Sequence, residues 1–151
     1  DRIIWLDADC YLKSAINQQL LELISPDNVL STHFGVKHVA NDKTYFSCET
    51  GFFIVNKRHP MFTDFLETYK NIYVNDEVDN LRRFYDGEVY GETVRRLEKQ
   101  GAKMLDLNPG QQHKTPIPRS VIAPYISHYK AGAKENLDLG DLKKQEEENA
   151  I

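Results

Sequence analysis

The residues Arg2-Ile3-Ile4-Trp5-Leu6-Asp7-Ala8-Asp9 decide which fold this sequence predicts. The apolar run from Ile3 to Leu6 indicates a buried β-strand that is covered on both faces. Two carboxylates follow this strand, separated by one small residue. Because side chains at positions i and i+2 of an extended segment point the same way, Asp7 and Asp9 should converge at the carboxyl end of the strand. Open α/β sheets bind their ligands at that edge.

This pair of carboxylates predicts a cation site. Carboxylates as close as Asp7 and Asp9 repel each other unless a proton or a cation lies between them. A hard divalent ion such as Mg²⁺ or Mn²⁺ is the natural occupant, because it prefers oxygen ligands. The alternative is a solvated turn after a strand, since Asp-x-Asp also occurs by chance.

The composition is ordinary for a globular protein with a hydrophobic core. The chain has 151 residues, of which 40% are hydrophobic and 28% charged, which is enough for one domain. The net charge is −4 and the Lys and Arg residues are scattered, so nucleic-acid binding is not expected. No apolar run in the sequence approaches the length of a membrane span.

The two cysteines, Cys10 and Cys48, are too few for a disulfide scaffold. We expect two reduced, partly buried thiols in a cytoplasmic protein. Both cysteines lie beside the motifs that carry the functional prediction, so they are candidates for neighbours in space. A disulfide bridge between them is the alternative.

Apolar spacing along the chain predicts an α/β fold in which helices flank a sheet. Helices are expected over residues 12–24, 61–73 and 86–99, and strands over 28–33, 52–55, 102–107 and 121–125. A polar loop is expected over 35–43, and a helical or disordered tail from Glu135 onward. The first strand has nothing before it to pair with. Either a preceding segment is missing from this chain or another subunit covers the strand, and we favour the first.

Five later positions carry polar residues or glycine where a ligand would be expected. Gly51 precedes the second apolar strand, where glycine indicates unusual dihedral angles or a close backbone approach. Glu49 and Thr50 come just before Gly51. The alternative to a ligand-binding role is that they are only the exposed acidic start of a strand. Asp86 opens a helix, and the alternative is that it is only the N-cap. For His128, after the last strand, the alternative is a surface histidine beside a tyrosine.

Together these stretches resemble glycosyltransferases of the GT-A fold, and most of all the retaining, metal-dependent branch that includes glycogenin and bacterial lipopolysaccharide galactosyltransferases. Asp7-Ala8-Asp9 resembles the DxD motif of this family, and residues 50–56 are similar to its small-Gly-apolar-Asn strand near the donor sugar. His128 and Lys134 resemble its late motif, which supplies a metal ligand and a phosphate contact. In that motif a glycine falls three residues after the histidine, whereas Gly132 falls four after His128.

The resemblance implies a mixed sheet flanked by helices, as in the second half of a Rossmann-like GT-A domain. The partial domain would span residues 1–134, without the half that usually contacts the nucleotide base, and residues 135–151 would be a polar tail. The implied partners are a nucleotide-sugar, in the first place a UDP-sugar, and a glycan, lipid or protein acceptor. A missing N-terminal half or a second copy of the chain is a further expected partner.

The resemblance also implies roles for individual residues in a metal-dependent sugar transfer. The ligands of Mn²⁺ or Mg²⁺ would be Asp7, Asp9 and His128. The residues that bind the donor and its phosphates would be Asp7, Thr50, Gly51, Lys130 and Lys134. The residues that face the donor sugar or the acceptor hydroxyl, and act in catalysis, would be Glu49 and Asp86. Neither the sugar nor the stereochemical outcome follows from these residues.

Two other functions are compatible with the same motifs. Phosphotransferases of the haloacid dehalogenase type also place Asp-x-Asp after an apolar strand, and their first Asp, here Asp7, is the nucleophile. They usually carry Thr or Val two residues after the second Asp, whereas this chain has Tyr11. The third function is a non-catalytic, transferase-like binding module, which the missing first half favours.

Overall fold

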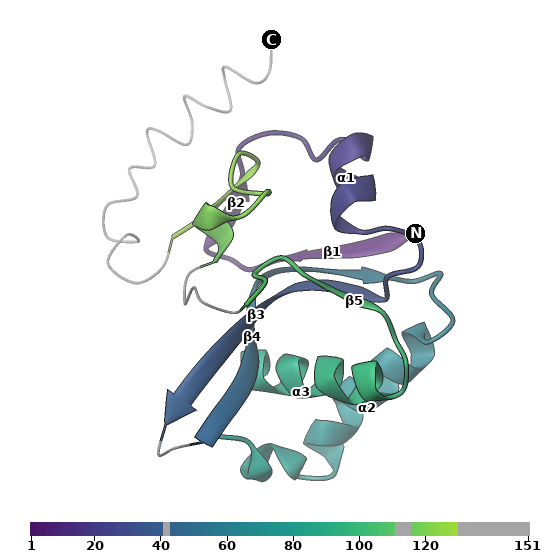
Figure 1. The fold of residues 1–151 in the computed structure, drawn as a ribbon, viewed down its shortest axis with the longest axis vertical. Coiled ribbons are helices and arrows are strands. Elements are labelled where there is room, and N and C mark those ends of the chain that lie inside the picture. The colour runs from purple at the N-terminus through teal and green to yellow at the C-terminus, as the bar shows by residue number, and fades with distance from the viewer. Residues whose placement is uncertain (41–42, 111–115, 130–151) are drawn as a thin grey trace.

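A mixed four-stranded sheet forms the centre of the computed structural model, which describes residues 1–40, 43–110 and 116–129 (Figure 1). The strand order is β1-β4-β3-β5, with β4 antiparallel to β1 and β3, and β3 parallel to β5. The strands are β1 (Arg2–Leu6), β3 (Ser31–Ala40), β4 (Lys43–Asn56) and β5 (Met104–Asp106). The expected α/β class with a mixed sheet is confirmed.

Helices and a small ribbon cover the two faces of this sheet (Figure 1). On one face lie the helices α2 (Phe62–Val74) and α3 (Asp86–Lys99), joined through the 3₁₀-helix η1 (Glu77–Asn80). On the other lie helix α1 (Gln18–Ile24) and the 3₁₀-helix η2 (Ile117–Arg119). That side also carries an antiparallel ribbon of β2 (Cys10–Leu12) and β6 (Ile126–His128).

Two large apolar clusters, one on each face of the sheet, form most of the core, and a smaller cluster of Ile72, Val78 and Val89 adjoins α2, η1 and α3. The cluster on the α1 side consists of Leu20, Ile24, Phe34, Phe52, Ile54, Ile117, Ile122 and Ile126. The cluster on the α2–α3 side consists of Leu30, Cys48, Val55, Phe65, Tyr90, Val94, Leu97 and Ala102. Neighbours on β4 such as Ile54 and Val55 belong to different clusters, because successive side chains of a strand point to opposite faces.

Two glycines let α3 approach the backbone of β4 closely. A Cβ atom at Gly87 would come within 2.5 Å of the carbonyl oxygen of Cys48, and one at Gly91 within 2.8 Å of the Cα of Ser47. No side chain fits at either position unless the backbone moves, so glycine is required for this packing. The close packing holds Asp86, the first residue of α3, against β4.

Strand β1 forms as predicted, but the prediction that it is covered on both faces is wrong. The exposed fractions of Ile3, Ile4 and Trp5 are 41%, 39% and 49%. Among the described residues β1 pairs only with β4, so it is the outer strand of the sheet. A continuous apolar run reports the hydrophobicity of a strand and not how many neighbours it has. Part of Trp5 is covered by Phe53, whose ring stacks on it with centroids 5.7 Å apart.

Several expected elements differ in extent from those in the structure, for example β4, which spans Lys43–Asn56 where a strand was expected only over 52–55. The helix expected over 12–24 begins only at Gln18, because Asn17 caps it by accepting a hydrogen bond from a backbone amide at 2.8 Å. Most of the polar loop expected over 35–43 belongs to β3 and β4, whose pairing satisfies the backbone groups of polar residues equally well. Residues 121–125 form turns, and the last strand follows them.

Among the helices that the structure describes, none combines the length and the apolar character that a membrane span requires. Lys130, Lys134 and the expected tail lie outside the described residues. Both cysteines are free, as expected, and Cys48 is buried in the α2–α3 cluster.

Candidate functional site

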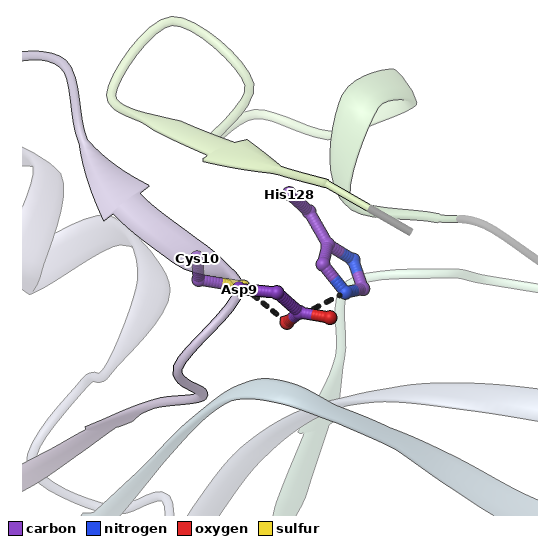
Figure 2. Close-up of side chains that lie close together, drawn as sticks. All are labelled: Asp9, Cys10 and His128. Atoms are coloured by element: carbon purple, nitrogen blue, oxygen red, sulfur yellow. Dashed lines mark hydrogen bonds and ion pairs between the residues drawn. The ribbon is translucent and has the colours of Figure 1, made fainter. Parts of the chain in front are cut away.

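The turn after β1 and the β2–β6 ribbon bring a carboxylate, a thiol and an imidazole together. Cys10 is the direct antiparallel partner of His128, so their side chains lie on the same face of the ribbon. His128 Nε2 is 3.3 Å from Asp9 Oδ1, and Cys10 Sγ is 4.0 Å from the same oxygen. Figure 2 shows the Asp9 carboxylate reaching toward both side chains. The three ligand atoms lie within 4.8 Å of one another, and we call Asp9, Cys10 and His128 the ribbon corner.

Backbone hydrogen bonds tie the ribbon corner to the central sheet. The amide of Asp7 donates to the carbonyl of Gly51 at 3.0 Å, and the amide of Cys10 donates to the carbonyl of Asp7 at 2.9 Å. From the far end of the described chain, the amide of Tyr129 donates to the carbonyl of Asp9 at 2.9 Å. Three segments that are distant in sequence are therefore held in one place by main-chain contacts.

Gly51 lies directly beneath the ribbon corner. A Cβ atom at this position would be 3.1 Å from Cε1 of His128 and 3.3 Å from Sγ of Cys10. Both distances are shorter than ordinary van der Waals contact, so a side chain here would displace the imidazole or the thiol. The close approach that the sequence predicted at Gly51 is thus present, and its partners are side chains of the corner.

Asp7 is not a member of the ribbon corner. Strand β1 ends at Leu6, so Asp7 and Asp9 lie in a turn and the two-residue periodicity of a strand does not align them. Asp7 Oδ1 instead accepts a hydrogen bond from the amide of Ala8 at 2.8 Å, in an exposed position. The structure brings Asp9 and His128 together, and the metal role of Asp7 stays a prediction.

Negative charge is concentrated around the ribbon corner. The pKa of the Cys10 thiol is raised to about 12, first by its partial burial and then by the charges of Asp9, Asp7 and Glu49. Carboxylates that together disfavour another anion are the environment that a cation stabilises. The side chains of Asp9 and His128 are only 17% and 3% exposed, so water screens this charge weakly.

The other predicted donor-site residues lie together in a second place, beside Gly51. Thr50 Oγ1 donates to Asp86 Oδ2 at 2.9 Å, and Glu49 Oε1 accepts from the amide of Gly51 at 3.2 Å. Glu49, Thr50 and Asp86 line one cavity of about 270 Å³, which we call the polar cavity. Its remaining lining residues are Val36, His38, Ser47, Cys48 and Tyr85.

Asp86 does not act as the N-cap of α3, so the simpler explanation for its presence is wrong. The capping position is Tyr85, whose side chain makes no capping hydrogen bond. The carboxylate of Asp86 accepts from the amide of Gly87 through Oδ1 at 2.9 Å and from Thr50 through Oδ2. The side chain is therefore fixed at the entrance of the polar cavity by the first turn of α3 and by β4.

A second cavity, of about 360 Å³, adjoins the polar cavity and shares Thr50 and Asp86 with it. We call it the aromatic cavity, because rings supply most of its wall. Its other lining residues are Ile3, Trp5, Phe53, Val55, Phe62, Phe65, Leu66, Tyr69 and Tyr90. Three aromatic residues of α2, Phe62, Phe65 and Tyr69, belong to this wall.

Cys10 is the member of the ribbon corner that the sequence did not assign to the metal site. It follows the predicted ligand Asp9 directly, and thiol and imidazole are a common pair of metal ligands. Only the pairing of Cys10 with His128 across the ribbon identifies Cys10 as a candidate ligand, and this pairing is not visible in a local sequence pattern. His33, the last residue of the strand expected over 28–33, lies in β3 and is 2% exposed.

No protein-family model, no curated protein and no solved structure matches this chain. The resemblance to GT-A glycosyltransferases therefore stays a prediction from the motifs, and the site has to be argued from its own geometry.

Proposed function

We propose that the chain belongs to a metal-dependent glycosyltransferase that transfers a sugar from a nucleotide-diphosphate donor, such as a UDP-sugar, to an acceptor hydroxyl. One observation carries the proposal. Three motifs chosen from the sequence for one chemistry, Asp7 to Asp9, Glu49 to Gly51 and His128, lie in mutual contact although they are distant along the chain. The proposal requires this proximity, because a His128 remote from Asp9 could not share an ion with it.

The donor set of the corner suits a divalent cation. The Asp9 carboxylate and the His128 imidazole are 3.3 Å apart, which is close enough for both to contact one ion. Bound there, with Asp7 as a further ligand, Mn²⁺ or Mg²⁺ would supply Lewis-acid stabilisation of the negative charge that grows on the departing diphosphate. Lys130 and Lys134 would add positive contacts to the phosphates.

The other predicted site residues would act at two neighbouring places, the ribbon corner and the polar cavity. Gly51 leaves the space in which the imidazole of His128 reaches Asp9. On the adjacent residue, the hydroxyl of Thr50 holds the carboxylate of Asp86 at 2.9 Å. Asp86 and Glu49 thereby face the polar cavity, where they would contact the donor sugar or the acceptor hydroxyl. Fixed polar groups of this kind lower a barrier because they need no reorganisation during the reaction.

Titration calorimetry of the purified chain with UDP, UDP-sugars and Mn²⁺ tests this proposal. We expect binding that requires Mn²⁺ and that weakens by at least about tenfold in Asp9→Asn, since even partners that only support a ligand contribute that much. Asp64→Asn is the matched control, because Asp64 is an exposed acid in the first turn of α2. It should bind like the parent chain.

Two results would replace the proposal. If neither the parent chain nor Asp9→Asn binds UDP, UDP-sugars or Mn²⁺, the chain is better described as a non-catalytic binding module. Hydrolysis of p-nitrophenyl phosphate with Mg²⁺, lost in Asp7→Asn, would instead identify a phosphotransferase, because only that mechanism uses Asp7 as a nucleophile.

A further inference from the structure

We propose that the ribbon corner also binds Zn²⁺, with the sulfur of Cys10 as a direct ligand beside Asp9 and His128. Zinc bound in this way would exclude the Mn²⁺ of the transferase from the same corner. The zinc site itself rests on the geometry of the three residues alone, whereas the competition with Mn²⁺ rests on the proposed function.

The ribbon presents its sulfur and nitrogen ligands in a fixed relation. Cys10 and His128 are directly opposite each other on β2 and β6, which places their Cβ atoms about 5 Å apart on one face. Asp9 immediately precedes this pair, and its backbone is held by Tyr129 at 2.9 Å. The ligands therefore come from two paired strands and a tethered turn.

The distances between the ligand atoms fit one shared zinc ion. Bonds of about 2.3 Å to sulfur and about 2.0–2.2 Å to nitrogen or oxygen keep any two ligands of one zinc within roughly 4.5 Å of each other. The distances in the corner are 4.0 Å from Cys10 Sγ to Asp9 Oδ1 and 3.3 Å from His128 Nε2 to the same oxygen. The sulfur and the imidazole nitrogen lie within 4.8 Å of each other, so rotation of the side chains would bring all three atoms onto one ion.

The chemistry of the donors favours zinc over manganese or magnesium. A thiolate is a soft ligand that Mg²⁺ and Mn²⁺ use poorly, whereas sulfur, imidazole and carboxylate together suit Zn²⁺. On binding, the thiol of Cys10 exchanges its proton for the metal, and the proton leaves to the buffer. Three protein ligands leave the fourth position of a tetrahedral ion open for water or a phosphate oxygen.

The second cysteine supplies the matched control. Cys48 is a free thiol like Cys10, but it is 3% exposed and packs in the α2–α3 cluster, on the other face of the sheet. A metal that reacted with any thiol of the chain would not distinguish the two. A metal bound at the ribbon corner would depend on Cys10 alone.

Cobalt is the probe, because Co²⁺ takes zinc sites and shows a thiolate-to-metal charge-transfer band in the near ultraviolet. Co²⁺ is titrated into the parent chain, Cys10→Ser and Cys48→Ala, each shown to be folded by circular dichroism, and Zn²⁺ is then added. We expect the band in the parent chain and in Cys48→Ala, its absence in Cys10→Ser, and its loss when Zn²⁺ displaces cobalt. A band that survives in Cys10→Ser, or a folded parent chain without the band, overturns the zinc site.

The competition is measured separately, through the electron paramagnetic resonance signal of free Mn²⁺. In the parent chain Zn²⁺ should release bound Mn²⁺, and Cys10→Ser should need at least about tenfold more Zn²⁺ for the same release. Mn²⁺ that stays bound while the cobalt band is present overturns the competition. A chain that binds no Mn²⁺ contradicts the proposed function and the competition with it, but the cobalt band still decides the zinc site.

Discussion

Two imidazoles of this protein are almost equally buried and yet lie in different chemical surroundings. The side chain of His128 is 3% exposed and its Nε2 is 3.3 Å from the carboxylate of Asp9. His33 is 2% exposed, and its Nδ1 has no hydrogen-bond partner among the described residues. Phe46 and Tyr90 contribute rings beside it, with centroids 6.3 Å and 6.5 Å away. Burial alone therefore does not mark a histidine as a ligand; what distinguishes His128 is the set of groups that faces it.

The difference has an electrostatic consequence. Burial lowers the pKa of His33 to about 4, and the charge of Asp106 offsets only part of that effect. The centre of β3 therefore holds a neutral imidazole. The ribbon corner, in contrast, places the carboxylate of Asp9 beside His128, and the charges of Asp9, Asp7 and Glu49 act on the neighbouring Cys10. The corner therefore offers a place for positive charge.

The largest expected effect is a loss of stability at acidic pH that originates at His33. The unfolded state binds a proton below about pH 6.5, whereas folded His33 resists protonation down to about pH 4. The free energy of unfolding is therefore unaffected by the titration of His33 above pH 6.5. It falls as the pH drops from 6.5 toward 4, by up to about 3 kcal/mol. Urea unfolding at pH 7 and at pH 4.5 measures the loss. In His33→Phe, which keeps an aromatic ring without a titrating group, the loss should shrink; an equal loss would assign it to other groups.

A somewhat smaller effect is expected for metal binding when His128 is removed. His128→Ala should weaken Mn²⁺ and Zn²⁺ binding by about thirtyfold, or about 2 kcal/mol, because one ligand atom is lost while Asp9 stays in place. His33→Phe serves as the control, since it removes an equally buried imidazole outside the corner. Metal titration calorimetry of the two variants compares the two regions directly. Equal weakening in both would remove the distinction between the two histidines.

The smallest expected effect concerns the glycine that supports the corner. Gly51→Ala places a methyl group 3.1 Å from His128 and 3.2 Å from Ile117, so the imidazole should move away from Asp9. We expect metal affinity to fall by about fivefold, or about 1 kcal/mol. Gly91→Ala, which crowds the backbone of Ser47 on the other face of the sheet, should lower stability and leave metal affinity unchanged. An unaltered affinity in folded Gly51→Ala would show that the corner does not depend on this close packing.

The comparison also separates what could be predicted from local patterns from what could not. The helix expected over 86–99 is present with those ends, because its apolar spacing is local and two glycines fit its packing surface. The segment 35–43 was expected to be a loop because its residues are polar, and polarity is also a local property. The strand conformation of residues 35–40 and of Lys43 comes from pairing between β3 and β4, which the sequence of a single strand cannot reveal.

Local sequence accounts for the apolar strand at residues 3–6, for the helix that begins at Asp86 and for the types of residue that can hold a cation. These features depend on the period of hydrophobic side chains and on the chemistry of single groups. Long-range packing settles that β1 is an outer strand among the described residues, that Cys10 joins Asp9 and His128, and that Asp7 is not one of the three grouped ligand residues. The register between strands from opposite ends of a chain is set by the packing of the whole molecule, and so no short stretch of sequence contains it.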